Sequence, residues 1–118
     1  MRRIAILFAL CALALPASAQ DAVPDAKATR AKALDDFTAY SAFLVANTNC
    51  SELNFNAEHL KTALYQSADA LRWTEAKRRQ EASELVRENT LKLQADPKAF
   101  CASARSMMIQ YQKAGTHF

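Results

Sequence analysis

The fold is decided by residues 56–95, which read NAEHLKTALYQSADALRWTEAKRRQEASELVRENTLKLQA and contain neither glycine nor proline. One uninterrupted helix of this length would extend about 60 Å at 1.5 Å per residue. Residues at helical spacing form two stripes, Leu60, Ala63, Leu64, Ser67 and Leu71, and then Ala82, Leu85, Val86, Asn89 and Leu93. Between the stripes, residues 72–81 are polar except for Trp73 and Ala76. The sequence predicts helix in both halves, with its weakest point in this polar segment.

Two cysteines flank the stretch and constrain its shape. Cys50 lies six residues before it and Cys101 six residues after it. Connectors of that length reach about 20 Å each, so they cannot bring the ends of a straight helix to the ~6 Å Cα separation of a disulfide. If the two cysteines pair within one chain, the stretch must fold back, and we place the bend at residues 71–78 with Thr74 as the next N-cap. The alternative is a straight helix whose cysteines bridge two chains; we expect the hairpin.

Residues 1–19, MRRIAILFALCALALPASA, have the form of a cleaved secretory signal peptide. Arg2 and Arg3 precede an apolar run shorter than the roughly 20 residues of a membrane span, and the small residues 17–19 suit signal peptidase. We expect an exported mature chain that begins at Gln20, in the periplasm of a Gram-negative bacterium or, alternatively, fully secreted. Loss of two arginines lowers the net charge from +3 to +1. That charge gives no case for nucleic-acid binding, and we expect no stable membrane insertion after cleavage.

Export also determines the state of the cysteines. Cys11 leaves with the signal peptide, so Cys50 and Cys101 are the two that remain. An isolated pair in an oxidising compartment is usually bonded. Closing a loop of about fifty residues contributes roughly 4 kcal/mol in the chain-entropy model. We therefore predict one structural disulfide, Cys50–Cys101.

The composition after the signal peptide favours an all-α fold. Residues 20–118 hold nineteen alanines, four valines and isoleucines together, and a single glycine, Gly115. Sheets need β-branched residues and glycine-bearing turns, whereas alanine has the highest helix propensity. We predict a small three- to four-helix bundle tied by the disulfide, with residues 20–26 as a disordered tail, 27–114 as the bundle domain and 115–118 as a C-terminal tail.

The first and last helices can be placed by their patterns. The first is expected from about residue 25 to residue 47. Its core positions are predicted to be Leu34, Phe37, Tyr40 or Ser41, and Leu44, with Phe43 beside them. Asp96 and Pro97 predict the start of the last helix, with Asp96 as N-cap and Pro97 at the first helical position. Its inner face is predicted to hold Phe100, Ala104, Met107 or Met108, and Tyr111.

The motifs of catalysis and cofactor binding are missing from the sequence. Zinc needs three or four ligands, and with the cysteines bonded only His59 and His117 remain. A haem held by Met107 or Met108 and a histidine is the weaker interpretation, because methionine on an apolar helix face usually fills a core. Phosphate-binding loops and nucleophile elbows require glycines. We therefore predict a non-enzymatic protein without metal or cofactor.

The bend carries the one candidate partner-binding surface. Tryptophan is enriched in binding hot spots, and Trp73 lies in a polar segment beside Arg72. The run Lys77-Arg78-Arg79 follows, although acidic residues four positions away can neutralise it along a helix. A solvated helix face and a tryptophan folded back onto the core are the plainer interpretations. The candidate partner-binding residues are Trp73, Arg72, Arg78 and Arg79.

Two functions are compatible with this pattern. The first is a protein-binding module, such as an inhibitor, immunity or accessory factor, whose partner is another exported or envelope protein. The second is an acid- or stress-responsive periplasmic chaperone, because 12 carboxylates titrate at low pH while a disulfide limits unfolding. In its plan of signal peptide, short helical domain and one long-range disulfide, the chain resembles the HdeA-type acid-stress chaperones and the immunity proteins that block peptidoglycan-cleaving toxins. The resemblance is architectural and assigns no residue a role.

Overall fold

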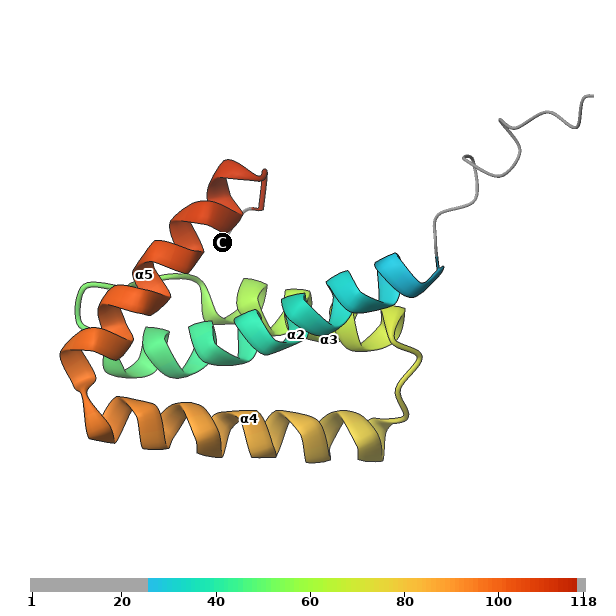
Figure 1. The fold of residues 1–118 in the computed structure, drawn as a ribbon, viewed down its shortest axis with the longest axis horizontal. Helices are drawn as coiled ribbons and strands as arrows, with labels where there is room; N and C mark the ends of the chain where they lie inside the picture. The colour runs from blue at the N-terminus through green and yellow to red at the C-terminus, as the bar shows by residue number, and fades with distance from the viewer. Residues whose placement is uncertain (1–25, 117–118) are drawn as a thin grey trace, which may run out of the picture.

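The computed structural model describes residues 26–116 and contains four helices (Figure 1). They are α2 (Ala26–Asn49), α3 (Ala57–Ala70), α4 (Glu75–Ala95) and α5 (Pro97–Lys113). No strand occurs within this described range. The predicted all-α bundle is confirmed. The predicted signal peptide lies outside the described residues, and so do the tail before Ala26 and the last two residues of the chain.

The helix α2 is central, because each of the other three helices packs against it. The helix α3 runs back alongside α2, and α4 then returns in the direction of α2 (Figure 1). The helix α5 leaves the end of α4 at a steep angle and crosses α2. The turn between α3 and α4 therefore lies near the N-terminal end of α2, while the start of α5 lies near its C-terminal end.

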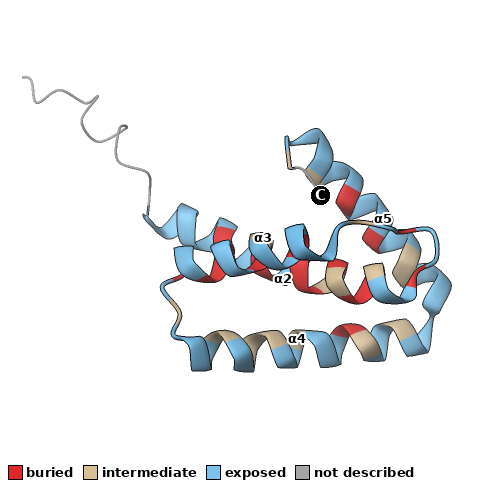
Figure 2. Ribbon diagram, turned by 180° about the vertical axis from the view of Figure 1, so that it is seen from behind, coloured by how far each residue is buried: buried red, intermediate tan, exposed pale blue. Residues whose placement is uncertain are grey.

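The core is built around α2. Phe37 and Phe43 of α2 are fully buried, as are Leu60 of α3 and Met108 of α5. Burying a side chain of this size contributes about 1.5–3 kcal/mol. The helix α4 contributes little to the core, for its one buried residue is Asn89, whose amide donates a 2.8 Å hydrogen bond to the Leu85 carbonyl. Figure 2 shows this difference, with buried positions concentrated on α2 and α3 and mostly exposed or intermediate positions on α4.

Two predicted core positions are wrong. Leu34 is 46% exposed and Val86 is 44% exposed. In each case the inner face of the helix is turned by one residue, so that Ala33 is buried in α2 in place of Leu34, and Leu85 is the better covered residue in α4. Adjacent helical residues lie about 100° apart, and a hydrophobic stripe in the sequence does not fix rotation to better than that.

The turn between α3 and α4 confirms the predicted bend. Asn56 caps α3 by accepting hydrogen bonds from the backbone N–H groups of Glu58 and His59, and α3 ends at Ala70. Thr74 then caps α4 by accepting one from the Lys77 N–H. The alternative of one straight helix from residue 56 to residue 95 is therefore excluded.

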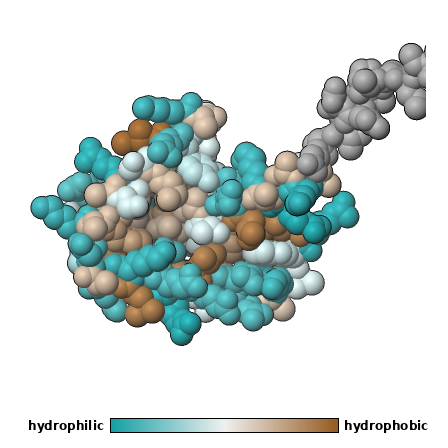
Figure 3. Space-filling model, viewed as in Figure 1, coloured by the Kyte–Doolittle hydropathy of each residue, from teal (hydrophilic) through white to brown (hydrophobic). Residues whose placement is uncertain are grey.

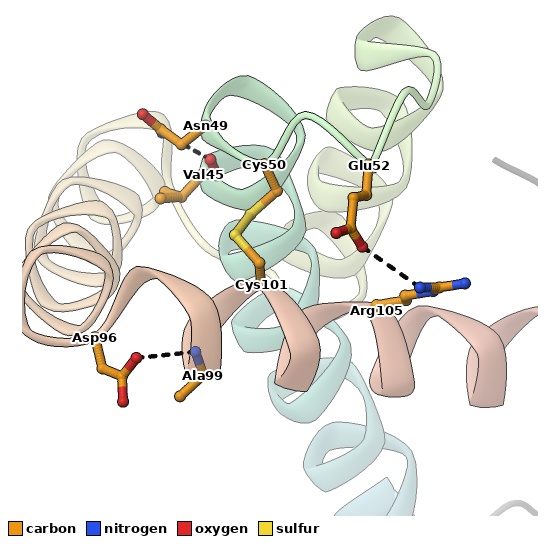
Figure 4. Close-up of a disulfide and its surroundings, with 8 residues drawn as sticks. All are labelled: Val45, Asn49, Cys50, Glu52, Asp96, Ala99, Cys101 and Arg105. Carbon is orange, nitrogen blue, oxygen red and sulfur yellow. Dashed lines mark hydrogen bonds and ion pairs between the residues drawn. A yellow bond between two sulfur atoms is a disulfide. The ribbon is translucent and has the colours of Figure 1, made fainter.

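The predicted disulfide Cys50–Cys101 is confirmed, with a Cα–Cα separation of 5.8 Å. Figure 4 shows it joining the end of α2 to the first half of α5. The last helix begins as predicted, because the Asp96 carboxylate accepts a 3.0 Å hydrogen bond from the Ala99 N–H and Pro97 takes the first helical position. The disulfide thus fixes the N-terminal half of α5 to the bundle.

The C-terminal half of α5 is held by Tyr111. Its ring packs edge-to-face on Tyr40 and Phe43, with centroid distances of 5.5 Å to each. Its hydroxyl donates a 3.0 Å hydrogen bond to the Asp36 carboxylate. Burial, and secondarily this hydrogen bond, raise the pKa of Tyr111 well above its usual value, so the phenol stays protonated. Tyr111 therefore anchors this half of the helix together with the buried Met108.

Candidate functional site

The candidate site is the end of the bundle where α3 turns into α4. We define the turn surface as five residues, Tyr65, Arg72, Trp73, Arg78 and Arg79. Four of them were predicted from the sequence, and the structure adds Tyr65, which is 46% exposed. Tyr65 could have been recognised in the sequence, because it follows the core residue Leu64 and therefore lies outside the apolar stripe of α3. An aromatic side chain at such a position is not explained by packing in the core.

Trp73 connects the turn surface to the core. Its ring packs edge-to-face on the fully buried Phe37, with the centroids 4.9 Å apart. The residue is half-buried, and the Lys77 ammonium lies 6.0 Å from the centroid of its ring. Trp73 therefore anchors the turn against α2 and offers a partner only the part of its ring that the core leaves open.

Arg78 is held by an aromatic face. Its guanidinium lies 4.4 Å from the centroid of the Tyr65 ring, which joins α4 to α3 by a cation–π contact. No acidic side chain of the described residues forms an ion pair with Arg78. Its charge is consequently available while its position is restricted by the ring.

Arg72 adopts an uncommon backbone conformation. Its φ is 56°, the one positive value at a non-glycine residue in the described chain. The N–H of Arg72 donates to the carbonyl of Asp69, and that of Trp73 donates to the carbonyl of Ala68. These two bonds are those of the Schellman motif that commonly ends a helix with a left-handed residue, most often glycine. An L-residue in this conformation costs about 1–2 kcal/mol.

The remaining cations of the bend are paired on their own helix. Arg79 forms an ion pair with Glu75, and the Lys77 ammonium lies 2.8 Å from the Glu81 carboxylate. The bond to Glu81 raises the pKa of Lys77. Exposed pairs four residues apart stabilise a helix by a few tenths of a kcal/mol. Arg79 therefore lies on a solvated helix face, as the plainer interpretation of the sequence predicted. Arg72 and Arg78 differ from it because they form no ion pair among the described residues.

Apart from the turn surface, the molecule has a concave region beside the disulfide. It has a volume of about 620 Å³ and lies between residues 49–52 and α5. Its charged groups include Glu52 and Arg105, which are both largely exposed and whose side chains approach to 3.4 Å. Figure 4 shows this contact beside the disulfide. Because this ion pair is long and exposed to solvent, it gives the cavity no preference for a particular ligand.

Residues 26–116 contain neither a cluster of metal ligands nor a helix that could span a membrane. No three histidine, cysteine or acidic side chains in residues 26–116 lie close enough together to hold a metal ion. None of the four helices has both the length and the apolar character needed to cross a bilayer. In Figure 3, hydrophobic side chains form separate patches within a mainly hydrophilic surface.

The turn surface brings together groups that can form contacts with a partner protein. Its two unpaired guanidiniums can donate to acceptors in a planar fork, and its two rings offer apolar faces beside them. Arginine, tyrosine and tryptophan are the residues that dominate protein-binding hot spots. Comparison with known proteins finds no family model that matches this chain, and no similar curated protein or solved structure.

Proposed function

We propose that this protein is a binding module that recognises another exported protein through the turn surface. The observation that carries the proposal is Arg78, which has no acidic partner among the described residues and is held 4.4 Å above the half-exposed ring of Tyr65. A guanidinium restrained before binding loses less side-chain entropy when a partner docks. Trp73 anchors the turn that precedes α4 on the buried Phe37 of the core.

The titratable groups with shifted pKa values support a binding role over a catalytic one. In the described chain these groups are Lys32, Tyr40, Lys77 and Tyr111, and each pKa is raised. Their usual values already lie near 10, so each shift moves the group further from neutrality. A general acid or base works best with a pKa near the working pH. These shifts reflect hydrogen bonding and burial within the bundle.

The proposal is tested by site-specific cross-linking. A photo-activatable phenylalanine analogue replaces Ala76, an exposed residue in the first turn of α4, and in a control chain it replaces Ala102, an exposed residue of α5. We expect a protein partner to cross-link at position 76 and not at position 102. The partner, once identified by mass spectrometry and purified, should bind Arg78→Gln about tenfold more weakly, as expected for a hot-spot residue.

A matched variant controls for the loss of charge. Arg87 is exposed on α4 and forms no ion pair among the described residues. Arg87→Gln removes the same charge about two and a half turns from Arg78, and it should leave the affinity unchanged. If the purified partner binds Arg78→Gln as tightly as the parent protein, or if Arg87→Gln weakens it equally, the turn surface is not the binding site.

An acid-responsive chaperone is the second candidate, favoured by the position of Asp36. This carboxylate accepts hydrogen bonds from the Lys32 ammonium at 2.6 Å and from the Tyr111 hydroxyl at 3.0 Å. Loss of these two bonds would weaken the attachment of α5, while the disulfide would keep that helix tethered. We expect Asp36→Asn to increase binding of a hydrophobic dye near pH 4. A parent protein that stays closed at about pH 2–3 and fails to suppress aggregation of a client contradicts this candidate.

A further inference from the structure

The two guanidiniums of the turn surface that lack an ion pair belong to Arg72 and Arg78. Neither forms a salt bridge with any described residue, whereas Lys77 and Arg79 close beside them are both paired. Residues 65–81 carry four basic and three acidic side chains, and two of those acids, Glu75 and Glu81, serve these pairs. The segment therefore carries a net charge of +1, and Arg72 and Arg78 are its two cations without an ion pair.

The two arginines are restrained in different ways, Arg78 at its guanidinium and Arg72 at its backbone. The Arg78 guanidinium lies over the Tyr65 ring, 4.4 Å from the ring centroid, and this contact restricts its position. Two backbone hydrogen bonds, Arg72 N–H to Asp69 and Trp73 N–H to Ala68, fix the left-handed backbone of Arg72. Glycine adopts that conformation without strain, yet here the position carries a long cationic side chain. Retained strain of this kind is a reason to look for a function of the side chain.

We propose that the turn surface receives an acidic segment of the partner protein, whose carboxylates pair with Arg72 and Arg78. This inference rests on the proposed function and specifies the chemistry of the partner. A guanidinium binds a carboxylate through two parallel N–H···O bonds, which gives both strength and orientation. The Tyr65 ring beside Arg78 screens one side of the contact from water, and this strengthens the charge interaction.

A protein segment suits this surface better than an anionic membrane. Membrane-surface binding by charge alone uses clusters of about 4–8 basic residues, and the five residues of the turn surface include two arginines without an ion pair. Insertion into the bilayer would need an apolar side chain that is free to leave the protein. Trp73 does not meet that need, because its ring packs on the buried Phe37. The guanidiniums of Arg72 and Arg78 instead suit carboxylates carried on a protein segment.

The inference is tested with a defined probe on the purified mature protein. Hexaglutamate is titrated into the isotope-labelled protein at low salt, with hexaglutamine as the uncharged control. We expect hexaglutamate alone to shift the side-chain N–H resonances of Arg72, Arg78 and Trp73. Raising the salt concentration should weaken the binding, because the contact is exposed and ionic.

Three variants assign the contact. Arg72→Gly removes a guanidinium at a position where φ is 56°, so the turn is kept by a residue that suits it. We expect Arg72→Gly and Arg78→Gln each to weaken hexaglutamate binding about fivefold or more. Arg87→Gln, which removes an exposed and unpaired arginine elsewhere on α4, should have no effect.

The outcomes separate this inference from the proposed function. A partner could cross-link at position 76 and yet bind with an affinity that neither Arg72→Gly nor salt changes. That result would contradict the inference of an acidic segment but not the proposed binding function. Hexaglutamate binding at Arg72 and Arg78, with no protein captured at the turn, overturns the binding module. The protein could instead bind phosphatidylglycerol vesicles through both arginines and fail to bind hexaglutamate. That result would identify an anionic membrane as the binding partner and would overturn the inference.

Discussion

The hydroxyl of Tyr111 donates a 3.0 Å hydrogen bond to the carboxylate of Asp36, 75 residues earlier in the chain. This bond lies where the C-terminal half of α5 crosses α2, far along α5 from the disulfide that holds its other half. The helix buries only Ala104 and Met108 completely. The attachment of α5 therefore depends on a covalent link in its first half and, in its second half, on Tyr111 together with the buried Met108.

Tyr111→Phe should loosen the C-terminal half of α5. The variant keeps the ring contacts with Tyr40 and Phe43 but loses the hydrogen bond to Asp36. We expect the free energy of unfolding to fall by about 1 kcal/mol, or somewhat more because the acceptor is charged. Amide hydrogen exchange should accelerate at residues 108–113 and stay unchanged in α3. Equal protection of α5 in the variant and the parent would show that the hydrogen bond does not hold the helix.

Alkaline pH should destabilise the parent protein more than this variant. Burial raises the pKa of Tyr111 in the folded state above the unfolded value of about 10. A raised pKa contributes stability that is fully present below pH ~10 and is lost as pH rises through the folded value. Urea unfolding at pH 8 and at pH 11 should therefore reveal a smaller decline in Tyr111→Phe. The decline should not vanish, because burial also raises the pKa of Tyr40.

The disulfide should account for a large part of the stability. Cys50 and Cys101 are separated by 51 residues, and a loop of that size corresponds to about 4 kcal/mol in the chain-entropy model. We expect the double variant Cys50→Ser/Cys101→Ser to unfold at a much lower urea concentration. The oxidised parent should be a monomer by intact mass, and reduction should add two hydrogen atoms. A dimer that dissociates on reduction would place the bond between chains.

The bend between α3 and α4 could be predicted from the sequence, because a disulfide within one chain requires the two ends of residues 56–95 to lie close together. Two cysteines close to the ends of a proline-free stretch cannot pair unless the stretch folds back, and Thr74 marked where the next helix could begin. The contact between Arg78 and Tyr65 could not be predicted in the same way. It joins residues of two helices, and it depends on how far each helix is rotated about its axis. A hydrophobic stripe leaves that rotation uncertain by one residue, as Leu34 shows.

The rotation of α2 and α4 can be checked by polar substitutions. Leu34 and Val86 are both more than 40% exposed, so Leu34→Gln and Val86→Gln should each change the free energy of unfolding by no more than about 0.5 kcal/mol. Leu60 is fully buried, and Leu60→Ala should cost about 2–5 kcal/mol. Chemical denaturation of the three variants provides the comparison. A cost of 2 kcal/mol or more for Leu34→Gln would mean that Leu34 belongs to the core, as the sequence suggested.

Arg72→Gly should stabilise the protein while it weakens partner binding. The left-handed backbone at φ 56° costs an L-residue about 1–2 kcal/mol, and glycine avoids that cost at the expense of about 0.5–1 kcal/mol of additional unfolded-state entropy. The net gain is therefore between zero and about 1.5 kcal/mol, measured by urea unfolding. Arg72→Ala is the matched control, because it removes the same guanidinium but keeps the strain, and it should give no such gain. A loss of stability in Arg72→Gly would mean that the Arg72 side chain supports the fold, and the strain at the turn would then no longer indicate a binding role.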